Sequence, residues 1–487
     1  MKNMSDFLER YDDKQVLYYF EELTRIPHGS GNTKEISDFL AAFAREQGAE
    51  CIQDKANNLI IRKPAAVGYE KAPVVMIQGH MDMVCEKNAD TVHDFQKDPL
   101  KLRLVSDHLM ATGTTLGGDD GIAVAYMMAL LADREAKHPE LEFVITTDEE
   151  TGMDGAKALD LSGSKASYLI NVDSEEEGVV LVSCAGGLRQ DCMLPIHRVT
   201  ECGKTFRIEM LGLQGGHSGS EIHKNRCNAV FLMARFLFEL RELADYSLYA
   251  FDGGCKDNAI PREAAVTLLV TEEEEERLLS AIRQLQQVYE EELLAAEPDF
   301  SMSIEPGQKG DFDVLEPVSF EKILFFLIQA PNGVQRMSGD IKGLVESSLN
   351  LGVLRITETE AEFHFSLRSS KKTYRTYMKE KLDYLITFLG GESSIHGEYP
   401  AWEYRRESKL RDRFRSLYLE EYGKEPVFEA IHAGLECGLL SAKMPELDMI
   451  SIGPDMKDIH TPKEALNLPS AIRVYHFLEK LLENMTE

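Results

Sequence analysis

Short apolar runs that end in histidine or acidic residues constrain the fold of this chain more than any other feature. The first part of the chain is predicted to contain strands at residues 58–62, 74–77, 141–147 and 168–172. Helical periodicity precedes or separates these runs at residues 13–25, 33–47 and 121–132. Strands that alternate with helices are typical of an α/β domain with a mixed, mainly parallel sheet and flanking helices.

The pattern changes from about residue 187 and returns after about residue 400. The intervening segment is predicted to contain strands at 205–210, 264–270, 349–356 and 362–367, with long helices at 228–243 and 272–294. The last segment is predicted to contain a helix at 410–421, a strand at 449–452 and a helix at 470–484. We therefore expect a catalytic domain made of residues 1–186 and 400–487, interrupted by an α+β lid domain at residues 187–399.

The charge of the chain argues against several classes of partner. Its 487 residues include 83 acidic and 53 basic ones, and the formal charge of −30 repels phosphate backbones and anionic membranes. The N-terminus has no apolar signal segment, and the longest apolar run, residues 123–132, is too short to span a membrane. The eight cysteines form no C-x-x-C pair, which favours a reducing compartment. We expect a cytoplasmic protein without nucleic-acid or membrane partners.

The first motif that carries chemistry is Gly79-His80-Met81-Asp82, directly after the expected strand at 74–77. Residues two apart in an extended chain point the same way, so His80 and Asp82 would share one side of a strand end. A carboxylate beside a ligating histidine fixes its tautomer and raises its basicity. By itself the pattern is weak, because a surface loop with a hydrogen-bonded histidine has the same sequence.

The second motif places two acidic residues in a glycine-rich turn before the helix at 121–132: Gly117-Gly118-Asp119-Asp120-Gly121. Either aspartate could cap that helix, which is the common use of such a residue. The alternative is a carboxylate that bridges two cations, and one aspartate could take each role.

The third motif, Asp148-Glu149-Glu150, follows the strand at 141–147. Neighbouring residues at a strand end project to opposite sides, so one glutamate could bind metal while the other acts as a general base. An acidic turn without chemistry is the alternative. Asp173 ends another apolar strand, and His460 follows the strand at 449–452 by a few residues.

The combination of these motifs is more specific than any one of them. All follow the carboxyl ends of expected strands, which is the edge of an open α/β sheet where active sites gather. Two histidines and several carboxylates without a thiolate suit a pair of Zn²⁺, Mn²⁺ or Co²⁺ ions. A shared aspartate would hold such ions roughly 3.5–4 Å apart, as in two-metal hydrolases.

The order of these motifs resembles the co-catalytic metallopeptidases that include carnosinases, peptidase T and aminoacylases. More specific strings are similar to the aminoacyl-histidine dipeptidases, also called cytosol non-specific dipeptidases, over essentially the whole chain. These strings are Gln78–Val84, Gly215–Gly219, Asn258–Glu263 and Ile431–Gly438. The resemblance implies a zinc aminopeptidase-like fold and hydrolysis of dipeptides, notably Xaa-His and carnosine-like ones, with two divalent ions per chain.

The resemblance also implies a role for each motif residue. Metal ligands are implied at His80, Asp119, Glu150, Asp173 and His460. Of these, Asp119 would bridge the two ions, with His80 and Asp173 on one and Glu150 and His460 on the other. Asp82 would orient His80, and Glu149 would be the general base and later the acid.

Four residues are implied to bind substrate: His217, Asn258 and Arg368 of the expected lid domain, and His432 of the last segment. Many relatives have an arginine motif where this chain has His432-Ala433-Gly434. The group that would bind the substrate carboxylate is therefore open between His432 and Arg368. His217 would bind substrate or stabilise the oxyanion.

Two other functions compete with a dipeptidase at this stage. An N-acyl amino acid deacylase or a carboxypeptidase would use the same metal site, and a catalytically inactive scaffold would keep the fold alone. The complete set of ligands with Glu149 argues against the scaffold. Homodimers are common in the family, whereas a long lid could supply His217 within one chain, so both assemblies stay open.

Overall fold

The structure is a computed structural model, and it describes residue 12 and residues 14–486. The chain divides into two compact units. The first unit comprises the described residues up to Ser183, Tyr404–Ala430 and those from Leu435 onward. The second unit comprises Cys184–Glu403 and Ile431–Gly434.

An eight-stranded mixed sheet forms the centre of the first unit, in the order β1-β2-β6-β3-β7-β21-β8-β20. Its strands are β1 (Glu50–Gln53), β2 (Leu59–Lys63), β3 (Val75–His80), β6 (Leu141–Thr146), β7 (Tyr168–Asn171), β8 (Val179–Cys184), β20 (Val427–Ile431) and β21 (Asp448–Ser451). The four adjacent strands β6, β3, β7 and β21 are parallel, whereas β1, β2 and β8 join antiparallel. These four strands are almost wholly buried, which explains why each is a short continuous apolar run in the sequence.

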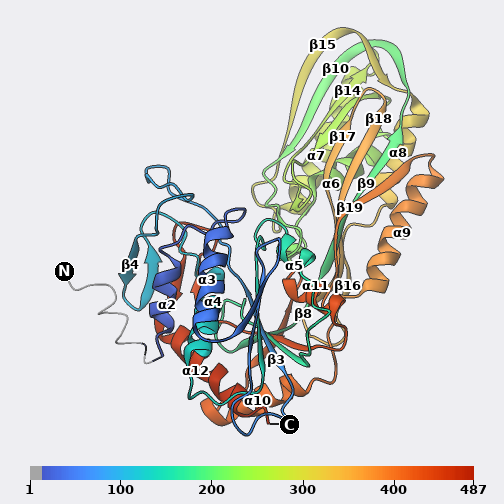
Figure 1. The fold of residues 1–487 in the computed structure, drawn as a ribbon. Helices are drawn as coiled ribbons and strands as arrows, with labels where there is room; N and C mark the ends of the chain where they lie inside the picture. The colour runs from blue at the N-terminus through green and yellow to red at the C-terminus, as the bar shows by residue number, and fades with distance from the viewer. Residues whose placement is uncertain (1–11, 13, 487) are drawn as a thin grey trace. The chain divides into compact units, whose positions relative to one another are not determined.

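The helices of the first unit are α2 (Val16–Leu23), α3 (Lys34–Glu46), α4 (Gly118–Ala132), α5 (Asp154–Ala158), α10 (Lys409–Tyr422), α11 (Glu436–Lys443) and α12 (Leu468–Glu483) (Figure 1). Helix α4 is apolar on every side and is buried along almost its whole length. A small sheet in the order β22-β23-β5-β4 completes the unit. Its strands are β4 (Leu102–Val105), β5 (His108–Ala111), β22 (Met456–Lys457) and β23 (Ala465–Asn467).

An antiparallel nine-stranded sheet forms the second unit, in the order β15-β10-β14-β12-β17-β18-β9-β19, with β16 paired to β17. Its strands are β9 (Gly186–Pro195), β10 (Arg198–Leu211), β12 (Ser247–Gly253), β14 (Ala264–Val270), β15 (Ser301–Leu315), β16 (Gly333–Met337), β17 (Val345–Ile356), β18 (Glu360–Ser369) and β19 (Glu392–Tyr399). Four helices pack with this sheet: α6 (Ala229–Leu240), α7 (Glu275–Leu293), α8 (Pro317–Gln329) and α9 (Lys372–Phe388). A two-stranded pair, β11 (Gly216–His217) with β13 (Ala259–Ile260), and the short helix η1 (Ile222–Lys224) lie outside the large sheet.

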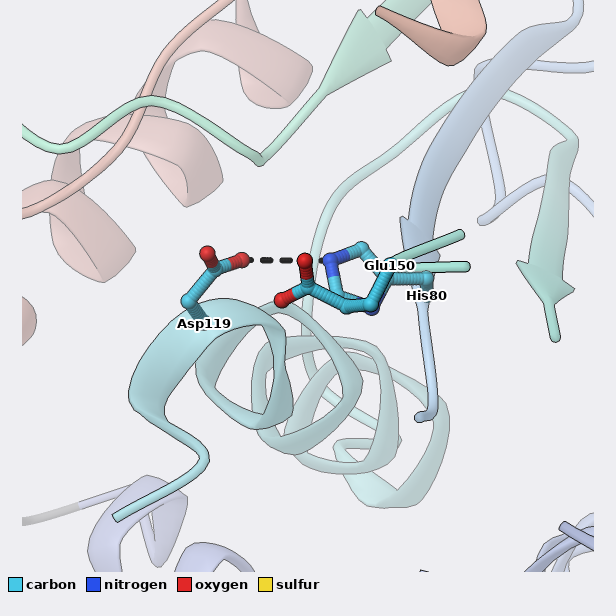
Figure 2. A group of neighbouring side chains, drawn as sticks. All are labelled: His80, Asp119 and Glu150. Atoms are coloured by element: carbon cyan, nitrogen blue, oxygen red, sulfur yellow. Dashed lines mark hydrogen bonds and ion pairs between the residues drawn. The ribbon is translucent and has the colours of Figure 1, made fainter. Parts of the chain in front are cut away.

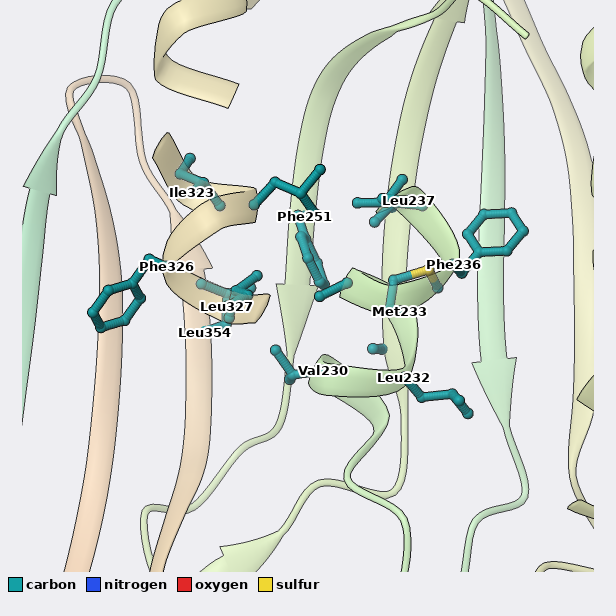
Figure 3. Close-up of a cluster of buried hydrophobic side chains, with 14 of the residues drawn as sticks. Val230, Leu232, Met233, Phe236, Leu237, Phe251, Ile323, Phe326, Leu327 and Leu354 are labelled. Carbon is teal, nitrogen blue, oxygen red and sulfur yellow. The ribbon is translucent and has the colours of Figure 1, made fainter. Parts of the chain in front are cut away.

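The core of the second unit lies between its sheet and its helices. Figure 3 shows side chains of α6 and α8, among them Phe236 and Leu327, packed near Phe251 of β12 and Leu354 of β17. Full burial of each such side chain stabilises the fold by about 1.5–3 kcal/mol. Asn228 begins α6, because its Oδ1 accepts the backbone N–H of Val230 at 3.0 Å.

The expected fold class is confirmed: the chain is α/β with a mixed sheet and flanking helices, and a second sheet and its helices are inserted into the sequence. The expected helices and strands are present with ends shifted by a few residues, except that β10 begins at Arg198 and not near residue 205. Residue 13 of the helix expected at 13–25 lies outside the described residues. Division into domains at residues 187 and 400 stays a prediction. The sequence did not reveal that Ile431–Gly434 returns to the second unit. In the described part of the chain, no helix is both long and apolar enough to cross a membrane.

Candidate metal centre

Three parallel strands bring most of the candidate ligands to one edge of the sheet. His80 is the last residue of β3 and lies opposite Thr146 of β6, while Gln78 lies opposite Asn171 of β7. The segments that follow β6 and β7 therefore start beside His80. They carry Glu149, Glu150 and Asp173, as expected from the common direction of these strands.

His80 is 1% exposed and faces two carboxylates. Its Nε2 lies 3.1 Å from Oδ1 of Asp119 and 3.7 Å from Oδ1 of Asp173 (Figure 2 shows the contact with Asp119). Its Nδ1 lies 2.9 Å from the backbone oxygen of Asp82, so a proton on Nδ1 would be donated to that carbonyl. This tautomer leaves the Nε2 lone pair free to bind a cation.

Asp119 lies between the two candidate histidines. Its Oδ1 contacts His80, and its Oδ2 lies 3.1 Å from Nε2 of His460. The same His460 nitrogen lies 2.9 Å from Oε1 of Glu150. Ligand atoms of His80, Asp119 and Glu150 all lie within 4.8 Å of one another, the spacing that a bound cation requires (Figure 2).

Asp120 has a different environment from Asp119, to which it is joined by a cis peptide bond. Its Oδ2 accepts the backbone N–H of His80 at 3.1 Å, and its Oδ1 has no hydrogen-bond partner among the described residues. Burial raises the pKa of Asp120 well above its ordinary value. Asp120 also forms a group with His80 and Asp173 that could hold an ion, so both aspartates stay candidates for the bridging role.

Asp82 connects the residues expected to perform the chemistry. Its Oδ1 accepts the backbone N–H of Glu149 at 3.1 Å and lies 3.5 Å from Nδ1 of His80. Its Oδ2 accepts the hydroxyl of Ser30 at 2.7 Å and the backbone N–H of Glu150 at 3.4 Å. Burial opposes ionisation of Asp82, but these donors together with His80 hold its pKa below the ordinary value. The expected role in orienting His80 thus has a geometric basis, and Asp82 also positions both glutamates.

The electrostatics of the cluster fit bound divalent cations. Burial raises the pKa of Glu149 to about 8 and that of Asp173 well above its ordinary value, and neighbouring carboxylates add to both shifts. The hydrogen bonds of His460 with Asp119 and Glu150 raise its pKa to about 10. The cluster therefore holds more carboxylates than histidines, and bound cations would offset the repulsion between these carboxylates. The donor set of imidazole and carboxylate, without thiolate, suits Zn²⁺, Mn²⁺ or Co²⁺.

Two buried glutamates that the sequence analysis did not single out support this cluster. Glu464 accepts backbone N–H groups of the turn that carries Asp119. Glu436 accepts the Thr146 hydroxyl at 2.6 Å and an N–H of Gln78, and burial raises its pKa to about 7. The only sequence signal for Glu464 is its place four residues after His460.

The candidate substrate-binding residues gather in the second unit. His217 ends β11, and its Nδ1 accepts the backbone N–H groups of Gly219 at 3.3 Å and Ser220 at 3.1 Å. This leaves the proton on Nε2 as a free donor, and burial lowers the pKa of His217, with Arg368 adding to the effect. Asn258, just before β13, accepts the backbone N–H of Ser218 at 2.9 Å through its backbone oxygen.

Arg368 and His432 lie beside His217. A β-carbon on Gly219 would stand 3.0 Å from Cε1 of His217, 3.1 Å from Cζ of Arg368 and 2.8 Å from the backbone oxygen of His432. Nε2 of His432 lies 2.7 Å from Oγ of Ser348, and burial together with Arg368 lowers the pKa of His432 to about 3. His432 is therefore neutral near pH 7. Arg368 donates to the hydroxyl of Tyr399 at 2.9 Å, and its buried Nε has no hydrogen-bond partner among the described residues, which leaves it the better candidate for a substrate carboxylate.

The sequence of the chain matches a known enzyme family over a range that contains these residues. The chain belongs to peptidase family M20/M25/M40, whose profile matches residues 76–484. It is 38% identical over 468 residues to the cytosol non-specific dipeptidase of Escherichia coli (strain K12), covering 96% of each chain. Among solved structures it is similar to the aminoacylhistidine dipeptidase from Vibrio alginolyticus, with a TM-score of 0.92 and 35% identity over 98% of this chain and 99% of that one.

A more distant structure, aminopeptidase PepT from Bacillus cereus, has 15% identity and a TM-score of 0.56 over 98% of this chain and 99% of that one, and it supports the fold alone. The resemblance drawn from the motifs is confirmed by the family and by the two closer relatives. The predicted enzyme class, a metallopeptidase, is confirmed as well.

Proposed function

We propose that this chain hydrolyses dipeptides, Xaa-His dipeptides among them, with two divalent cations, preferably Zn²⁺. The observation that carries the proposal is the position of Asp119, whose carboxylate oxygens lie 3.1 Å from Nε2 of His80 and of His460. Each of these histidines also lies near a second carboxylate. The names of two relatives, a cytosol non-specific dipeptidase and an aminoacylhistidine dipeptidase, support the substrate class. The first name and the eight free cysteines support a cytoplasmic location.

The proposed ligands divide into two sets that share Asp119. His80 and Asp173 would hold one ion, and Glu150 and His460 the other. Such ions, when bound, make a nearby water more acidic and polarise the scissile carbonyl. Asp82 keeps the Nε2 of His80 free, because the backbone oxygen of Asp82 faces Nδ1 at 2.9 Å.

Glu149 is proposed as the group that moves protons. Its backbone N–H is donated to Oδ1 of Asp82 at 3.1 Å, and its half-buried carboxyl group, whose pKa burial raises, would be a stronger base than an exposed carboxylate once ionised. Glu149 would accept the proton of the attacking water and deliver it to the leaving amine.

Residues of the second unit are proposed to bind the substrate. The Nε2–H of His217 would donate to the developing oxyanion, a contribution of about 2.7–4 kcal/mol in comparable sites. Arg368 would bind the free carboxylate of the dipeptide, since a guanidinium fork matches a carboxylate. Asn258 stays a candidate for the other end of the substrate, and a homodimer stays a prediction that light scattering would test.

The test compares four substrate types on protein with measured metal content. A dipeptide, its N-acetylated form, its C-terminal amide and an N-acyl amino acid should be offered at equal concentration. We expect cleavage of the dipeptide and much slower cleavage of the amide, because Arg368 would lose its partner. Preference for an N-acetylated substrate would instead support a deacylase or a carboxypeptidase, and hydrolysis unchanged by complete metal removal would refute the proposal.

A further inference from the structure

Backbone groups at both ends of the buried helix α4 form hydrogen bonds with side chains from distant parts of the chain. At its N-terminus, four consecutive backbone N–H groups point to the carboxylate of Glu464, which is 3% exposed. The donors are Leu116 at 2.7 Å and Gly117 at 3.1 Å to Oε2, and Gly118 at 2.7 Å and Asp119 at 3.3 Å to Oε1. One carboxylate therefore satisfies four backbone donors of the glycine-rich turn that leads into α4, whose regular helical backbone follows Asp119 and Asp120.

Glu464 also belongs to the segment that carries His460. Within that segment Glu464 donates its backbone N–H to the oxygen of Thr461 at 3.0 Å, and the Thr461 hydroxyl donates to the oxygen of Asp458 at 2.7 Å. His460 has a φ of 59° and Asp458 a φ of 51°, a left-handed backbone region that is uncommon for non-glycine residues. These two hydrogen bonds thus close the turn that presents His460, with Glu464 at its end.

These contacts make Glu464 a link between two proposed ligands of one cation. Asp119 and His460 are 341 residues apart in the sequence, yet Oδ2 of Asp119 lies 3.1 Å from Nε2 of His460. The four hydrogen bonds of Glu464 join the turn of Asp119 directly to the segment of His460.

We propose that Glu464 is a positioning residue of the metal centre, which sets the distance between Asp119 and His460 and so the affinity for the cation that they share. The proposal rests on the proposed function, because it takes these two residues as ligands. A glutamine in place of Glu464 would turn an amide NH₂ toward at least one pair of N–H donors, since only its oxygen accepts. The turn of Asp119 would then move away from His460.

A simpler alternative is that Glu464 only stabilises helix α4. The opposite end of the same helix offers a matched control. Nζ of Lys63 donates to the backbone oxygens of Leu130 and Asp133, both at 2.6 Å, and Lys63 lies outside both proposed ligand sets. Burial lowers the pKa of Lys63 to about 8, so its ammonium remains largely charged at pH 7. Loss of either residue removes a charged cap from α4, but only Glu464 adjoins a ligand.

The experiment measures cation affinity in the full-length Glu464→Gln, Glu464→Asp and Lys63→Met variants by competition with a chelator, together with the visible spectrum of the Co²⁺-loaded proteins. Thermal unfolding of the metal-free proteins measures the loss of helix stability. We expect Glu464→Gln to bind one of its two cations about 10–100-fold more weakly, as found for residues that orient metal ligands, and to alter the Co²⁺ spectrum. Glu464→Asp, which keeps the charge, should be intermediate, and Lys63→Met should lower the unfolding temperature but keep both affinities.

Unchanged affinity and spectrum in Glu464→Gln would overturn the proposal, and so would an equal loss of affinity in Lys63→Met. If Glu464→Gln does not fold, Glu464→Asp decides the question by the same two measurements. A parent protein that binds two cations but cleaves no dipeptide would refute the proposed function. The cation affinities of the Glu464 and Lys63 variants would still decide whether Glu464 positions the ligands. A parent protein that binds no divalent cation would refute both.

Discussion

Replacement of Glu149 by glutamine tests the proposed chemistry most directly. Glutamine keeps the size of the side chain but cannot accept the proton of water near neutral pH. The backbone of residue 149 should stay in place, because its N–H bond to Asp82 at 3.1 Å does not involve the changed atoms. We expect both cations to remain bound and kcat to fall by about 10²–10⁴, which corresponds to about 2.7–5.4 kcal/mol of transition-state stabilisation. The fall should lie at the upper end if Glu149 serves both proton transfers.

Glu150→Gln is the matched control on the neighbouring residue. Oε1 of Glu150 lies 2.9 Å from Nε2 of His460, so this change should weaken one cation site and should be partly rescued by added Zn²⁺. The assay is metal content by mass spectrometry beside turnover of a Xaa-His dipeptide. Metal loss in Glu149→Gln but not in Glu150→Gln would mean that the two roles are exchanged. Parental turnover of fully loaded Glu149→Gln would refute the mechanism.

Three further results are expected. Asp119→Ala should lose metal whereas Asp120→Asn should keep both ions, and the reverse metal content would assign the bridging role to Asp120. His217→Ala should keep its fold and both ions while kcat falls about 10²–10³-fold, the effect of one lost oxyanion donor, and near-parental turnover would make His217 structural. The folded-state pKa of Glu436, about 7, lies above its ordinary value of 4.5. The free energy of unfolding should therefore fall as pH rises from about 4.5 to about 7, because the folded protein must ionise a buried carboxyl group. Chemical denaturation at pH 5 and pH 8 should therefore show a larger loss of stability in the parent than in Glu436→Gln, and equal losses would contradict this.

Much of the site could be predicted because it depends on local sequence. An apolar run followed directly by His80, Glu149 or Asp173 marks the carboxyl end of a strand, and parallel strands bring those ends together without further information. The glycine-rich turn placed Asp119 at the start of a helix. The resemblance implied Asp119 and not Asp120 as the bridging residue, and the coordinates add only that Asp119 faces His80 and His460, because both aspartates lie in groups that could hold an ion.

The parts that the sequence did not reveal depend on contacts between distant segments. Glu464 and Lys63 satisfy the two ends of α4 from remote positions, and nothing in their own neighbourhoods indicates this. The sequence left His432 open as a substitute for an arginine, yet burial and the nearby Arg368 lower its pKa and leave it neutral. The return of Ile431–Gly434 to the second unit likewise follows from tertiary packing and not from composition.

The hydrogen bonds between Glu464 and the turn of Asp119 also determine when, during synthesis of the chain, the candidate metal centre can be completed. The two residues are 345 positions apart, and at about 5–20 residues per second a ribosome needs roughly 20–70 s to add that length of chain. For most of that interval the nascent chain contains His80, Asp119, Glu150 and Asp173, but it has neither His460 nor the carboxylate that fixes the turn. With the ligands proposed above, complete metal loading would follow the synthesis of residues 460–464, and chains released before residue 464 would carry an unfinished binding site.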